Sequence, residues 1–217
     1  MSTIRSLLKY LVVFIIASTI SWPAYAQETL DDLLKAIKLN DLLTVRAAVS
    51  KGMDVDSSDA NGNTLLMLST MEGNFDIVRF LLNQKARVPV RNIYGDSALM
   101  FAALKGHLEI ARVLVAYGAE VNAKGWTPLH YCASEGKTEI CRFLLEQGSD
   151  VNALSANGTS ALMMAARGGR LDIVRLLIQH KADPKFRNDS GATALSWALK
   201  DGNTDLAELL RRTGARD

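Results

Sequence analysis

The sequence predicts an all-α repeat solenoid of six similar units, each made of two antiparallel helices. A short polar turn recurs along the chain at spacings of 33, 33, 30, 33 and 33 residues. Its central positions are residues 40, 73, 106, 136, 169 and 202. Each turn lies between two apolar stretches, such as 98–103 and 110–115, which is typical of a helix, a tight turn and a second helix.

The length and composition fit a folded chain. It has 217 residues, 48% of them apolar, with 25 Lys and Arg against 23 Asp and Glu. These values allow a buried core and argue against a disordered chain. Two Cys residues cannot build a disulfide-rich miniprotein, nor can they alone supply a four-cysteine zinc site.

Residues 1–26 have the order of a secretory signal peptide. Two basic residues precede an apolar run at 11–20, and a small-residue cleavage pattern follows at 24–26. The run is shorter than the roughly 20 residues of a membrane anchor. An uncleaved anchor and an unrelated buried helix are the alternatives. With the cut placed after Ala26, residues 27–217 form one exported domain.

Removal of this leader makes the chain neutral. Residues 27–217 carry 23 basic and 23 acidic residues, because the leader holds two basic residues and no acid. A nucleic-acid-binding protein usually has a broad positive field, which this balance does not supply. We therefore expect a soluble monomer with no nucleic-acid partner and no membrane span after leader removal.

Unit four carries the fullest motif. The residues T-P-L-H at 127–130 open its first apolar stretch, Gly136 lies at its central turn, and a leucine pair at 144–145 precedes Gly148. In this motif and in its period, the chain resembles the ankyrin-repeat family from about Asp31 to the C-terminus. The resemblance implies a non-enzymatic module that binds a protein partner.

The family places short β-hairpin fingers between its helix pairs, here expected at segments such as 88–95 and 151–158. The six units then cover 29–61, 62–94, 95–124, 125–157, 158–190 and 191–217, with the first and last as polar caps. Hydroxyl side chains are placed to cap the first helix of units two to six, at residues 64, 97, 127, 160 and 193, and Asp31 fills that slot in unit one. Gly at 52, 118, 148 and 214 is placed to end second helices in a left-handed conformation, with Lys85 and Lys181 as exceptions.

No catalytic, metal-binding or cofactor-binding motif is found. None of His107, His130 and His180 stands at metal-ligand spacing from another His or Cys, and no phosphate-loop or dinucleotide fingerprint is present. The family uses His at the positions of His107 and His130 to brace loops. We expect no catalytic residue, no metal and no cofactor.

Cys132 and Cys141 form a candidate disulfide. They lie in one unit, nearly equidistant from the turn at Gly136, a spacing that allows them to face each other across two antiparallel helices. An exported protein meets an oxidising environment. The alternative is two small buried apolar side chains.

An arginine column occupies one position of five successive second helices, at residues 46, 79, 112, 142 and 175. It is either a basic stripe for an anionic partner or membrane surface, or a face neutralised by acids three residues earlier, at 76, 109, 139 and 172. The neutralised face is the favoured interpretation.

Ankyrin modules commonly bind proteins with the fingertips and the exposed side of the first helices, which together form a concave groove. At these positions the chain places large apolar, aromatic and arginine side chains, several of the kinds that dominate binding energy. They are Ile93 and Tyr94 on one fingertip, Trp126 beside the next, Leu154, Phe186 and Arg187 further along, and Met71, Leu104 and Arg167 on the helices.

The short 30-residue spacing arises in one finger. Val121 and Gly125 are four residues apart, where Val151 and Gly158 are seven apart. A finger shortened by three residues predicts a notch in the row, beside Tyr94 and Trp126, as the centre of the partner site. The alternative is that these two rings pack on each other.

We therefore expect a non-enzymatic protein-protein interaction module. The compact exported array resembles periplasmic proteins of Gram-negative bacteria. The alternative function is a ligand- or cofactor-responsive accessory or protective factor for a secreted or periplasmic enzyme.

Overall fold

The computed structural model of the protein describes residues 22–216, and that part of the chain contains only helices, turns and loops. Most of the predicted signal peptide lies outside the described residues. No helix within 22–216 has the length and apolar character needed to span a membrane. The helices are α2 (Trp22–Lys38), α3 (Leu42–Ser50), α4 (Leu65–Met71), α5 (Phe75–Asn83), α6 (Ala98–Lys105), α7 (Leu108–Ala116), α8 (Pro128–Glu135), α9 (Thr138–Glu146), α10 (Ala161–Arg167), α11 (Leu171–Gln179), α12 (Ala194–Lys200) and α13 (Thr204–Arg212).

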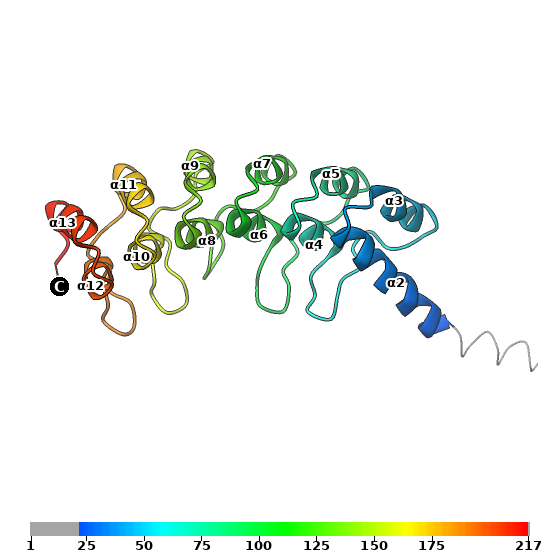
Figure 1. Cartoon of the computed structure of the whole chain (residues 1–217), viewed down its shortest axis with the longest axis horizontal. Coiled ribbons are helices and arrows are strands. Elements are labelled where there is room, and N and C mark those ends of the chain that lie inside the picture. Colours follow the sequence, from blue (N-terminus) through cyan, green and yellow to red (C-terminus); the bar gives the residue numbers. More distant parts are fainter. Residues whose placement is uncertain (1–21, 217) are drawn as a thin grey trace, which may run out of the picture.

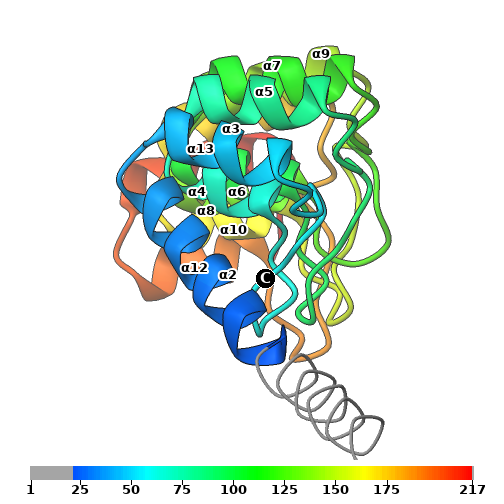
Figure 2. The same cartoon turned by 90° about the vertical axis from the view of Figure 1, so that its right-hand side faces the viewer.

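The helices stack in two rows along one long axis (Figure 1). The inner row is α2, α4, α6, α8, α10 and α12, and each inner helix is followed by its partner in the outer row. The loops between successive pairs project to one side as fingers, which Figure 2 shows as parallel loops at the right-hand edge. The predicted all-α repeat solenoid is therefore confirmed.

The core runs continuously between neighbouring units. Ala103, Ala133 and Ala166 are fully buried in successive inner helices, and their small side chains let these helices approach closely. Large apolar residues such as Leu99 and Ile140 fill the space between the two rows. Each unit therefore buries its apolar surface only against its neighbours.

Side-chain oxygens start the inner helices as predicted. Four hydroxyl groups accept a hydrogen bond from the backbone N–H three residues later, which satisfies a free helix donor. They belong to Thr64, Ser97, Ser160 and Thr193. Unit four differs, because the Thr127 N–H donates to Nδ1 of His130.

Asp31 does not cap a helix, which corrects the prediction for unit one. It lies inside α2, which begins at Trp22. Residues 24–30 contain no Gly or Pro and several good helix formers, so the helix continues upstream. Pro23 falls in the first turn, where its missing N–H breaks no helical hydrogen bond. The predicted cut after Ala26 also falls within α2.

The fingers are not β-hairpins, a second correction. Within residues 22–216 the only bridges are isolated ones, between Ser58 and Thr64 and between Leu154 and Ser160. Each full-length finger instead narrows to a single tight turn that its own side chains close. Only two residues separate each turn from the next helix, which is too few for a ladder of paired strands.

Lys85 and Lys181 take the left-handed conformation that the repeat predicts. Both have φ of 66°, whereas the equivalent residues of the other units are Gly, such as Gly52 and Gly118. A side chain in this region costs about 1 kcal/mol or more. The array keeps the conformation because the residues after the turn must reach the next finger.

We expect Lys85→Gly to raise the free energy of unfolding by about 1 kcal/mol, since glycine relieves this strain. For a chain of this size, the gain corresponds to roughly 2–4 °C in melting temperature, measured by circular dichroism. Lys35→Gly, inside α2, is the matched control and should lower stability by about the same amount. An equal loss in both variants would contradict the assignment of strain to Lys85.

Candidate partner-binding notch

Five fingers form one row: finger 1 (53–64), finger 2 (86–97), finger 3 (119–127), finger 4 (149–160) and finger 5 (182–193). Fingers 1, 2, 4 and 5 each end in a tight turn whose first residue accepts a backbone N–H through its side chain. These residues are Asp59, Asn92, Ser155 and Asn188, at distances of 2.8, 2.8, 3.1 and 2.9 Å. Finger 3 is three residues shorter and lacks this turn.

Neighbouring full-length fingers are joined at their tips by one backbone hydrogen bond. The Ile93 N–H donates to the Asn61 carbonyl at 3.1 Å, and the Asp189 N–H donates to the Asn157 carbonyl at 3.0 Å. Fingers 1 and 2 thus form one pair and fingers 4 and 5 another. The short finger 3 lies between the two pairs.

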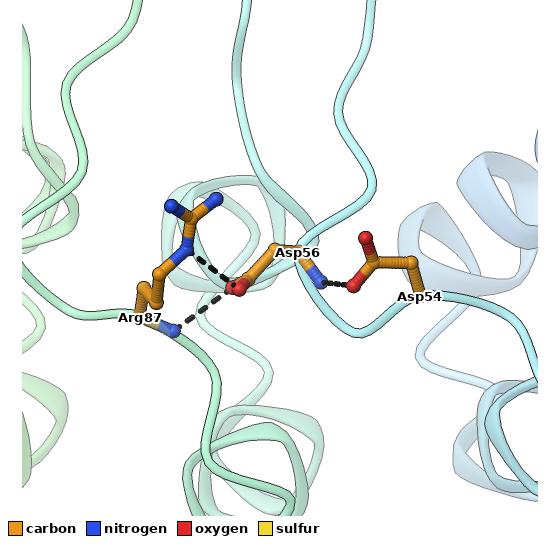
Figure 3. A network of polar contacts seen from close by, with 3 residues as sticks. All are labelled: Asp54, Asp56 and Arg87. Carbon is orange, nitrogen blue, oxygen red and sulfur yellow. Dashed lines mark hydrogen bonds and ion pairs between the residues drawn. The ribbon is translucent and has the colours of Figure 1, made fainter.

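The bases of the fingers are joined by side chains. In Figure 3 the Asp56 carboxylate lies between two loops and accepts the Arg87 N–H at 2.9 Å and Nε–H at 2.8 Å. Asp56 is itself held, because its N–H donates to Asp54 at 3.0 Å. This acidic residue and its neighbours therefore fix finger 1 against finger 2.

The same joint recurs further along the row. Asn122 accepts the Asp150 N–H at 2.8 Å, and Asn152 accepts the Asp183 N–H at 2.8 Å. The equivalent residue of finger 2 is Pro89, which has no side-chain acceptor for Glu120 of finger 3. Fingers 2 and 3 therefore lack both the tip bond and the base bond.

A hollow of about 640 Å³ lies at this joint. The aromatic rings of Tyr94, Trp126 and Tyr131 line it together with the charged side chains of Arg91, Asp96, Glu120 and Lys124. We call this hollow the notch. The shortened spacing predicted a notch beside Tyr94 and Trp126, and the structure has one there.

One wall of the notch is held in place. The ring of Trp126 packs against His130 at 5.5 Å and Tyr131 at 5.6 Å between centroids. The Tyr131 hydroxyl donates to the Asp96 carboxylate of finger 2. Burial, and then this hydrogen bond, raise the pKa of Tyr131, so its hydroxyl remains a donor.

The other wall is an exposed fingertip. Ile93 is 68% exposed and Tyr94 72% exposed, and within the described chain the Tyr94 ring has no aromatic partner. Trp126 packs on the residues of its own unit, so the alternative in which Tyr94 and Trp126 stack on each other is not what the structure shows.

Charged groups at the notch balance each other. Arg91 donates to the Gly95 carbonyl at 2.7 Å and its guanidinium lies 3.7 Å from Glu120. Lys124 is exposed on finger 3, and Asp96 accepts the Tyr131 hydroxyl. Two basic and two acidic side chains thus line the notch, which has no net charge.

The remaining predicted residues lie away from the notch. Leu154, Phe186 and Arg187 are on fingers 4 and 5, and the Arg187 Nη1–H donates to the Gly191 carbonyl at 3.0 Å. Met71 and Leu104 are half-buried against the core. The Arg167 guanidinium lies 5.7 Å from the ring centroid of Trp197. Their role in partner binding stays a prediction.

Several side chains of the notch were not singled out in the sequence, among them Arg91, Asp96, Glu120, Lys124 and Tyr131. The sequence does distinguish Tyr131, because it carries a hydroxyl at a repeat position where the other units have apolar residues. The equivalent residues are Leu68, Phe101, Met164 and Trp197. No spacing rule predicts that its hydroxyl reaches Asp96 in the previous finger.

Cys132 and Cys141 are joined by a disulfide between α8 and α9, with Cα atoms 5.6 Å apart. Both residues are fully buried. Cys132 is next to Tyr131 in α8, so the bond links the helix that carries Tyr131 to its outer partner.

Three arginines of the column lie over aromatic rings, and the expected pairing with acids is found at one position only, which corrects that expectation. Among the described residues, only Arg112 forms the expected pair, 3.6 Å from Glu109. Arg46, Arg79 and Arg112 lie 5.3, 5.7 and 4.9 Å from the ring centroids of Phe80, Phe75 and Phe143. The negative face of an aromatic ring attracts a guanidinium group. In this column such ring contacts are more numerous than ion pairs with the exposed carboxylates.

Two sequence models of one family match the chain. The model described as "Ankyrin repeats (3 copies)" matches residues 86–155 and 129–216. The model described as "Ankyrin repeats (many copies)" matches residues 33–82. No curated protein matches the chain.

His130 makes stability depend on pH. Its ring is fully buried; Nδ1 accepts from the Thr127 N–H, and Nε2 lies 3.0 Å from the Thr159 carbonyl. Burial is the main cause that lowers the pKa of His130, against the opposing effect of the Thr159 carbonyl. The folded state thus binds fewer protons than the unfolded state, and stability is complete above the unfolded pKa of about 6.5 and falls below it.

We therefore expect the free energy of unfolding to fall by about 1 kcal/mol from this group between pH 7.5 and 5.5, measured by urea denaturation. His130→Gln keeps a donor and an acceptor without the charge, and should flatten the pH profile. His180→Gln, an exposed control, should keep the wild-type profile. The idea fails if His130→Gln retains the wild-type slope.

Proposed function

The chain belongs to the ankyrin-repeat family, generally protein-protein interaction modules, and from this premise we propose that it binds a protein partner through its fingertips and concave face, with the notch at the centre. The array performs no reaction in this proposal. It serves as a rigid support whose fingers carry the recognition residues.

The observation that carries the proposal is the exposed tip of finger 2. Ile93 and Tyr94 present large apolar side chains to solvent, where the equivalent positions of finger 1 are Ala60 and Asn61. Exposed apolar groups on a fingertip add little to the core of the array. Beside a fixed aromatic wall they supply the kind of surface that dominates binding energy.

The proposed location is the periplasm of a Gram-negative bacterium. The order of basic, apolar and small residues within 1–26 supports export. A disulfide between Cys132 and Cys141 suits an oxidising compartment. Cleavage after Ala26 would shorten α2 to its remaining turns, which include the buried Leu33 and Ile37. The contacts of unit one with unit two would therefore survive the cut.

A second function rests on the notch itself. Its volume of about 640 Å³ lies in the range of small-molecule sites, and three aromatic rings line it. In this alternative the protein is a ligand- or cofactor-responsive accessory or protective factor for a secreted or periplasmic enzyme. A small molecule that copurifies with the protein and is released by Trp126→Ala would favour it.

We expect Ile93→Ala with Tyr94→Ala to weaken partner binding by about tenfold or more. The melting temperature should stay near that of the wild type, because neither side chain is buried. The measurement is capture by the tagged protein from its own cell envelope, quantified by mass spectrometry, beside thermal unfolding. Trp126 is not used here, since its contacts with His130 and Tyr131 make its loss destabilising.

Leu39→Ala with Leu43→Ala is the matched control for this test. These side chains are 80% and 78% exposed on the first unit, far along the array from the notch. The control should capture the partner as the wild type does. Equal capture by both double variants would refute a binding role for finger 2.

We expect the protein isolated from the envelope fraction to begin at Gln27 and to contain no free thiol. Intact mass with and without reduction, after alkylation of the unfolded protein, measures both features. A chain that starts at Met1, or two alkylated cysteines without reductant, would contradict the proposed export.

A further inference from the structure

The fingers on either side of finger 3 each leave one backbone group without its usual partner. Asn61 and Asn157 use their carbonyls to accept the tip bond from the next finger. Tyr94 is their equivalent in finger 2, and Ala156 is the equivalent in finger 4 of the donor Ile93. In the described part of the chain, neither the Tyr94 carbonyl nor the Ala156 N–H has a hydrogen-bond partner.

The space around the fingertip glycines shows the same gap. A Cβ atom added to Gly62 would lie 3.5 Å from the Asn92 backbone, and one added to Gly158 would lie 3.2 Å from the Asn188 Cα. At Gly95, the same position in finger 2, nothing lies within 4 Å of such an atom. There is therefore room for one more backbone beside Gly95, where Gly62 and Gly158 have the next finger as a neighbour; Gly191 in finger 5, the last of the row, is open as well.

The tip that finger 3 lacks has a defined chemistry, because the four full-length fingers all have the same kind of tip. Each tip is a β-turn in which the N–H of a fourth-position Gly donates to the carbonyl of the first residue, at 2.8–3.0 Å. The turn leaves the N–H of its second residue and the carbonyl of its third residue free. These two groups form the bonds to the fingers before and after.

We propose that the notch binds a β-turn of the partner protein, which takes the place of the missing fingertip. The N–H of the second residue of the turn donates to the Tyr94 carbonyl, and the carbonyl of its third residue accepts from the Ala156 N–H. The inference rests on the proposed function, whose partner it describes. The bound turn continues the row of tip bonds that the structure shows between fingers 1 and 2 and between fingers 4 and 5.

The charges of the notch select a neutral turn. Arg91 and Lys124 balance Asp96 and Glu120, and a charged side chain inserted here would meet a group of its own sign. The rings of Tyr94 and Trp126 offer apolar contact to a turn of small residues. Turns of the Asn-Gly or Ser-Gly kind satisfy both conditions, like the tip of finger 4 at residues 154–159.

A variant with a longer finger 3 tests the inference, because the protein's own fingertip then fills the gap between fingers 2 and 4. Lys124 is replaced by the four residues at 154–157, which gives finger 3 the length and tip of finger 4. The graft should keep or raise the melting temperature, because it supplies both missing tip bonds. Lys124→Ala, which leaves the gap open, is the matched control.

The probe is a disulfide-cyclised peptide that carries the turn of residues 154–159, titrated into ¹⁵N-labelled protein and followed by NMR. We expect saturable shifts at the Gly95 amide and the Trp126 indole N–H. The graft should weaken binding about tenfold or more, and N-methylation of the second residue of the turn, which removes its donor, should do the same. The double variant Leu39→Ala with Leu43→Ala, whose residues lie outside the notch, should bind as the wild type does.

The absence of saturable shifts in the wild type, or equal binding of the N-methylated peptide, would overturn the inference. If the graft captures the envelope partner as well as the wild type does while Ile93→Ala with Tyr94→Ala fails to capture it, the notch does not hold a turn but the proposed function stands. If neither variant alters capture, the proposed function fails as well.

Discussion

Burial of each helix pair against its neighbours is the constraint on which the structure depends. The apolar core lies between the inner and outer rows and continues from unit to unit, with fully buried alanines where inner helices meet. The fingers lie outside this core. Three residues can therefore be lost from finger 3 at the cost of local hydrogen bonds only, while α6 and α8 still pack directly on each other. Variation in finger length is how such an array gains a specific site.

The period of the sequence predicted the architecture, the hydroxyl caps of four inner helices and the positions of the left-handed residues, because each depends on position within a unit. It did not predict the length of α2, which depends on local helix propensity upstream of the repeat. Contacts between units were also missed. The Tyr131 hydroxyl on Asp96 and the guanidinium of Arg46 over Phe80 join residues more than thirty positions apart, and no pattern within one unit reveals which partner a long side chain chooses.

The notch combines a fixed wall with an exposed one. Trp126 and Tyr131 are held by ring packing, and Tyr131 also by a hydrogen bond to finger 2, so they lose little freedom when a partner binds. Tyr94 and Ile93 are exposed on a tip that the side chain of Asn92 closes. The sequence identified Ile93, Tyr94 and Trp126 from residue type, whereas the part of Tyr131 in the fixed wall emerged only from the packing of α8 against finger 2.

Pro89 has an effect beyond the loss of one acceptor. Fingers 1 and 2 are cross-linked at base and tip, as are fingers 4 and 5. Within the described residues, only the Arg91–Glu120 ion pair joins finger 2 to finger 3, and the Tyr131 hydroxyl of α8 also reaches finger 2. The finger edge thus consists of two stiff segments that meet at a soft seam. A change in the angle between the two segments would alter the width of the opening, and Pro89 and the shortened finger 3 together determine where along the finger edge such a change can occur.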